Sequence, residues 1–68
     1  MSIREELDTI DRELAAARKR QDAGQFPEDE RETFLRYIEP RLSLVKARVR
    51  TEDMLKFVRS VEDDLDRL

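Results

Sequence analysis

The sequence predicts an all-α protein, with an antiparallel helical hairpin and a third, shorter helix. Three observations lead to this prediction. Apolar residues recur at steps of three and four along most of the chain, which is the spacing of a helix face. One glycine and two prolines in 68 residues leave few places for turns. Charged residues make up 46% of the chain and hydrophobic residues 38%, which suits solvated helices that each carry one apolar stripe.

The first predicted helix spans about residues 2–22. Ser2 suits the N-cap position, and Glu5, three residues later, completes a capping box. Gly24 is the expected stop, because glycine adopts the left-handed conformation that ends many helices. The apolar seam of this helix has the period of a coiled coil, and it consists of Ile3, Leu7, Ile10, Leu14 and Ala17.

The second predicted helix spans about residues 27–50. Pro27 suits its first position, and Phe26 is expected to fold back onto the new helix. Pro40 lacks a backbone N–H, so it predicts a kink near Glu39 or two abutting helical pieces. The apolar stripe consists of Phe34, Ile38, Leu42, Val45 and Val49, broadened by Leu35, Tyr37 and Leu44.

The third predicted helix spans about residues 52–67. After Val49 the apolar stripe loses its phase, and at Thr51 the charges change from basic to acidic, as they do where one helix ends and another begins. No glycine or proline marks the break, so one bent continuous helix remains an alternative. The stripe of this helix consists of Met54, Val58, Val61, Leu65 and Leu68.

Residues 1–68 are expected to form a single small domain that needs support beyond its own core. A chain of this size buries too little surface to be comfortably stable alone. The sequence has no cysteine and no histidine, which excludes disulfides and the usual zinc sites. We therefore expect oligomerisation, most simply a homodimer, or binding to a partner, and we expect no metal and no cofactor.

The sequence does not indicate an enzyme. Histidine and cysteine are absent, so no hydroxyl has an imidazole to activate it. The carboxylates lie mainly on helix faces with basic residues three or four positions away, which is typical of a solvated surface. A single glycine cannot build a phosphate-binding loop. No apolar run has the length of a membrane span, and the first residues of the chain are charged, so we expect a cytoplasmic protein. Without a catalytic centre, we also expect no small-molecule substrate.

The preferred hypothesis is a protein–protein interaction module with a regulatory or scaffolding role. In it, the seam of the first helix meets the stripe of the second, and apolar surface left over on the third helix binds the partner. Tyr37 and Phe57 are candidate anchors, because aromatic side chains often dominate interfaces. The candidate interface residues are Ile3, Leu7, Ile10, Leu14, Tyr37, Met54, Phe57, Val58, Val61 and Leu65.

The alternative hypothesis is a small nucleic-acid-binding or nucleoid-modulating regulator. Between residues 33 and 51 the acidic residue is Glu39, and a row of basic side chains could contact phosphates. The same side chains could instead pair with acids of the other two helices. The net charge of −3 favours neither partner class. The candidate nucleic-acid contacts are Arg36, Arg41, Lys46, Arg48 and Arg50.

Short stretches resemble three unrelated helical families. The pattern Ile3-Arg4, Leu7, Ile10-Asp11, Leu14 is similar to the first helix of the all-helical chorismate mutases, although the further arginine and lysine of that family have no matching spacing. Residues 26–30, with Phe34, Glu39 and Arg41-Leu42, resemble the central helix of the Hha/YmoA nucleoid-modulating proteins. The segment 24–30 also resembles a turn of the exonuclease VII small subunit. Because unrelated families fit the same stretches, these resemblances indicate helices joined by a turn, and we assign no family.

Overall fold

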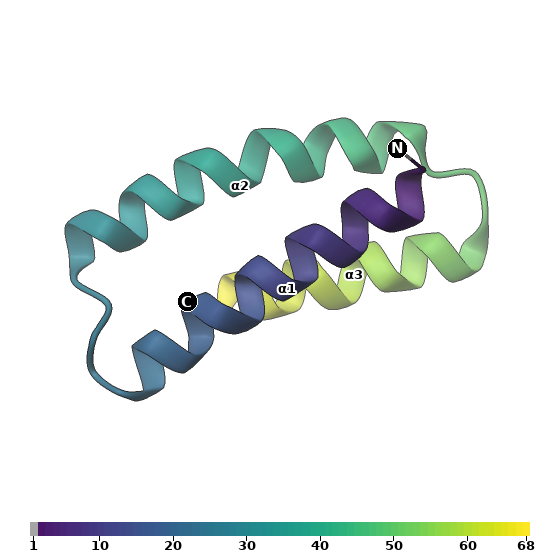
Figure 1. Cartoon of the computed structure of the whole chain (residues 1–68). Helices are drawn as coiled ribbons and strands as arrows, with labels where there is room; N and C mark the ends of the chain where they lie inside the picture. The colour runs from purple at the N-terminus through teal and green to yellow at the C-terminus, as the bar shows by residue number, and fades with distance from the viewer. Residues whose placement is uncertain (1) are drawn as a thin grey trace.

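The structure, a computed structural model, describes residues 2–68 and contains three α-helices joined by two short segments (Figure 1). Helix α1 spans Ile3–Asp22, α2 spans Glu28–Arg48 and α3 spans Glu52–Asp66. The predicted all-helical fold with three helices is confirmed, and residues 2–68 contain no strand. Within this described part, none of the helices combines the length and the apolar character that crossing a bilayer requires.

The helices begin at side-chain caps where the sequence offers them. Ser2 accepts a hydrogen bond from the Glu5 N–H at 3.1 Å, and Thr51 accepts one from the Met54 N–H at 3.3 Å. Both bonds satisfy a donor that the first helical turn leaves free. Pro27 is the N-cap of α2 and not its first helical residue, because its ψ of 154° is extended. Its carbonyl still accepts the first helical hydrogen bond, from Arg31 N–H at 2.9 Å.

Helix α1 ends in a Schellman motif at Gly24. The glycine has a φ of +71°, a conformation that strains any residue with a Cβ. Its N–H donates to the Gln21 carbonyl at 3.0 Å, and the Gln25 N–H donates to the Arg20 carbonyl at 2.8 Å. These two bonds reverse the chain within a few residues, so α2 starts close to the end of α1.

A clear break separates α2 from α3. Helix α2 ends at Arg48, and Val49 is extended, with φ −70° and ψ 132°. The alternative of one bent continuous helix is therefore wrong. Pro40, in contrast, does not divide α2, which runs unbroken past it (Figure 1). Since Pro40 is exposed, its ring lies on the solvent side of the helix, where a missing backbone bond disturbs the core least.

The core lies between the three helices, which form an elongated body of 37 × 19 × 18 Å. Figure 1 shows α2 running back along α1, and α3 running in the direction of α1. Helix α1 contacts both other helices most extensively, while α2 and α3 touch each other less. Every buried residue of the described chain is apolar, and the set is Leu7, Ile10, Leu14, Ala17, Ile38, Leu42, Val45, Val58, Val61 and Leu68.

Helix α3 closes the bundle and does not leave its apolar stripe open. Val58 and Val61 are both 0% exposed, and Leu68 is 5% exposed. The Gln21 side chain links α1 to the residues after α3, because its amide donates a hydrogen bond to the Leu68 carbonyl at 2.9 Å. The expectation that Val58 and Val61 remain as leftover surface for a partner is therefore wrong for this structure, because the stripe of α3 packs against the seam of α1.

Candidate interaction site

A second row, which contains two large apolar side chains, lies on the exposed side of α2. Tyr37 is 48% exposed and Leu44 is 68% exposed, and they are the large hydrophobic residues that the described chain leaves in solvent. The sequence predicted that both would broaden the buried stripe, but both are exposed beside it. Smaller exposed residues continue their spacing along the helix. We call this set the outer row, and it consists of Thr33, Tyr37, Pro40, Leu44 and Ala47.

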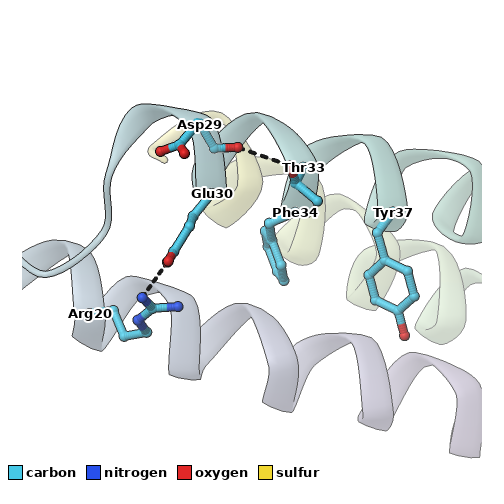
Figure 2. Close-up of a pocket in the computed structure, with 6 residues that line it drawn as sticks. All are labelled: Arg20, Asp29, Glu30, Thr33, Phe34 and Tyr37. Carbon is cyan, nitrogen blue, oxygen red and sulfur yellow. Dashed lines mark hydrogen bonds and ion pairs between the residues drawn. The ribbon is translucent and has the colours of Figure 1, made fainter.

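An open groove between α1 and α2 borders the outer row. At the end near the Gly24 turn it has a volume of about 430 Å³ (Figure 2). Figure 2 shows Phe34 and Tyr37 pointing from α2 toward α1, and Arg20 reaching from α1 toward Glu30. Ala16 and Ala17 line an adjoining, mainly apolar hollow, because their short side chains leave room beside the aromatic rings.

Tyr37 reaches across the groove and joins two charged side chains. Its hydroxyl donates to Glu13 Oε1 at 3.3 Å and accepts a hydrogen bond from Arg41 Nη1. The Arg41 guanidinium carbon lies 4.9 Å from the centroid of the tyrosine ring. Arg41 Nη1 also lies 3.5 Å from Glu13 Oε2, an ion pair without hydrogen-bond geometry, so this oxygen keeps an unused acceptor. These contacts hold the exposed ring in one orientation, which lowers the entropy cost of a contact made by it.

Arg20 organises the turn end of the groove in a similar way. Its guanidinium donates to the Gln25 carbonyl at 3.1 Å and forms an ion pair with Glu30 of α2. The guanidinium carbon lies 5.3 Å from the centre of the Phe26 ring, a cation–π distance. Phe26 in turn meets Phe34 edge to face, with centroids 6.1 Å apart. The turn is thus fixed on the same side of the molecule as Tyr37.

Most of the basic residues of α2 are paired within the chain. Arg48 Nη1 lies 3.3 Å from Glu6 Oε2 of α1, and Lys46 Nζ lies 3.3 Å from Glu62 Oε1 of α3. Arg41 pairs with Glu13 as described above. Within residues 2–68, Arg36 and Arg50 form no ion pair. The five candidate nucleic-acid contacts are therefore mostly engaged by acids of the neighbouring helices.

The candidate interface residues fall into three groups. Leu7, Ile10 and Leu14 of α1 are 0% exposed, as are Val58 and Val61 of α3, so these five side chains belong to the internal core. Phe57, a candidate anchor, is partly buried against that core, and so are Ile3, Met54 and Leu65. Tyr37 alone among the ten candidates is exposed.

The sequence analysis missed the rest of the outer row. Thr33, Pro40, Leu44 and Ala47 are separated from Tyr37 by steps of three and four, so the row has a heptad spacing of its own. That spacing was visible in the sequence. It was obscured because α2 also carries the buried stripe, and two apolar rows on one helix look like a single broad one.

Comparison with known proteins gives no relative for this chain. No family model matches it, no curated protein matches it, and no solved structure matches it. Residues 2–68 also contain no group of three or more aspartate and glutamate side chains placed to hold a metal ion.

Proposed function

We propose that this protein is a non-enzymatic interaction module that acts in regulation or scaffolding by binding protein through the outer row of α2. The observation that carries the proposal is the exposure of Tyr37 and Leu44 on one side of a helix whose other apolar side is already buried. In a chain this small, apolar side chains left in solvent forgo stabilisation that burial would provide. A binding role accounts for their position.

The surroundings of the outer row support this proposal. Interface centres tend to combine aromatic side chains with arginines, and the rim tends to be charged. Tyr37 lies beside Arg41, and Arg48 and Glu30 flank the row through ion pairs with α1. The alanines of α1 leave a hollow in which a partner side chain could be accommodated.

A photo-crosslinking experiment tests the proposal directly. Leu44 is replaced by the photoreactive residue p-benzoylphenylalanine, and the protein is irradiated in its own host. Leu44 is mostly exposed, so the bulky substitute should leave the fold intact. We expect covalent adducts with protein, which mass spectrometry identifies, whether the adduct is another protein or a second copy of this chain.

The matched control places the same photoreactive residue at Ser60, an exposed position of α3 outside the outer row. Adducts that form from position 60 as readily as from position 44 would reflect random collision. Absence of any adduct specific to position 44 would refute the proposed function.

A further inference from the structure

We propose that the occupant of the outer row is the outer row of a second copy of this chain, with the two α2 helices antiparallel. This inference rests on the proposed function and specifies its partner. The surface in question consists of Thr33, Tyr37, Pro40, Leu44 and Ala47, all exposed. None of these residues belongs to the buried core, so the pairing leaves the bundle of each chain unchanged.

The spacing of the outer row suits packing against another helix. Its steps of four, three, four and three residues average the period of a coiled-coil seam, so the row stays on one side of α2 along most of its length. The row has its largest side chains, Tyr37 and Leu44, on either side of Pro40. A helix that already buries one apolar stripe and exposes a second with this spacing can belong to two helix contacts at once.

A two-fold axis near Pro40 makes the row complementary to itself. In a symmetric dimer both subunits use the same patch, so each residue must pack against the residue that the two-fold axis places opposite it. With the axis between residues 40 and 41, Tyr37 faces Leu44 of the second copy. Thr33 faces position 48 of the second copy, one residue from Ala47. A parallel pair would instead place tyrosine on tyrosine and leucine on leucine.

The charges of α2 favour the antiparallel orientation. Its first turn is acidic, with Glu28, Asp29 and Glu30, and its last turn is basic, with Lys46 and Arg48. Three of these side chains, Glu30, Lys46 and Arg48, also form exposed ion pairs within their own chain. Antiparallel alignment brings the acidic end of each helix near the basic end of the other, whereas parallel alignment brings like charges together. Near the axis, each Arg41 remains beside its own Glu13.

A dimer interface of ordinary size would need only part of the surface that this chain exposes. A standard interface removes about 800 Å² from each partner. The described chain exposes 4991 Å², so such an interface would cover about one sixth of it. Helix α2 has 21 residues and is therefore about 31 Å long. Its outer side therefore extends over most of the 37 Å long dimension of the molecule.

Engineered disulfides test the orientation, because the natural chain has no cysteine. Two variants are prepared, Thr33→Cys and Ala47→Cys, which change small exposed side chains and keep Tyr37 and Leu44. One variant carries heavy isotopes, so the mass of each oxidised dimer shows which chains it contains. In the antiparallel pair, position 33 of one chain lies within about one residue of position 47 of the other. Positions 33 and 33 lie about 22 Å apart, beyond the reach of a disulfide.

We expect the mixture of the two variants to form mixed disulfide dimers at least tenfold faster than either variant forms dimers with itself. A predominance of same-variant dimers would show a parallel pair and overturn the proposed orientation. Equal rates for all combinations, matched by a Ser60→Cys control, would show random collision and overturn the proposal of a second copy.

Sedimentation of the wild-type protein and of Leu44→Glu provides the second measurement. We expect a dimer that forms with increasing concentration, and a dissociation constant raised at least tenfold by Leu44→Glu but unchanged by Ser60→Glu. A wild-type monomer at every concentration would overturn the inference. In that case, adducts of the photoreactive residue 44 with a different protein would still support the proposed function, so the two failures are distinguishable.

Discussion

Replacing Pro40 by alanine should stabilise this protein. Pro40 lies well inside α2, where it contributes no N–H to the bond that would otherwise reach the Arg36 carbonyl. Its ring also crowds the preceding turn. Since Pro40 is exposed in the single chain, the substitution removes no contact from the core and should therefore be a net gain.

The size of the gain follows from helix propensities. Proline inside a helix is about 3 kcal/mol less favourable than alanine. Helix α2 has already adjusted to the ring, so part of that cost is relieved, and we expect a gain of about 2 kcal/mol. For a domain of this length each 1 kcal/mol raises the melting temperature by about 4–8 °C. The expected rise is therefore about 8–16 °C.

Equilibrium unfolding in urea, followed by circular dichroism, measures this change. It should be carried out at low protein concentration, where association between chains contributes least. Arg36→Ala is the control, because Arg36 is an exposed residue of the same helix without an ion pair in residues 2–68, and its loss should change the free energy of unfolding by less than about 0.5 kcal/mol. An unchanged or lower stability for Pro40→Ala would refute the reasoning, since the ring would then be making a favourable contact.

Four further predictions concern the core, the turns and the alternative function. Leu14→Ala should lower the free energy of unfolding by about 2–5 kcal/mol in a urea titration, because Leu14 is fully buried; a loss below about 1 kcal/mol would contradict the assigned core. Gly24→Ala should lower the melting temperature through a loss of about 1 kcal/mol, since φ is +71° there, and an unchanged value would argue against the Schellman motif. Thr51→Ala should cost about 1 kcal/mol while Thr51→Ser retains the wild-type stability; equal losses would mean that the cap contributes nothing. Fluorescence anisotropy should detect no binding of a short DNA duplex at physiological salt, because Arg41, Lys46 and Arg48 are paired, whereas binding that weakens steeply with salt would favour the nucleic-acid alternative.

The sequence predicted the helices well because local signals determine them. Ser2 and Gly24 mark the two ends of α1 by hydrogen bonds to residues only a few positions away. The change of charge sign at Thr51 indicated the third helix, and Thr51 itself supplies the cap. Pro40 was predicted to kink or divide α2, but the division does not occur, since tertiary packing of Ile38 and Leu42 holds the helix together on the other side.

The candidate site was harder to predict, because it depends on how three amphipathic helices share their apolar faces. The stripe of α3 could have remained open for a partner or closed on the same chain, and the periodicity of Val58 and Val61 is identical in both cases. Once α3 closes the core, the surface residues are those that the core does not use. Leu44 was therefore misjudged from its position near the buried stripe, although it is 68% exposed.

The two short connecting segments, residues 23–27 and 49–51, also affect how quickly the chain folds. Consecutive helices are joined by short segments, and α1 and α3 are separated only by α2. Few contacts therefore join segments that are far apart in the sequence. Helical bundles of this kind have low contact order and fold within about microseconds to milliseconds. We therefore expect folding to be fast, so that the apolar stripes are exposed to other chains only briefly. Folding of the single chain leaves the outer row exposed, so this row is available to the second copy once the bundle is complete.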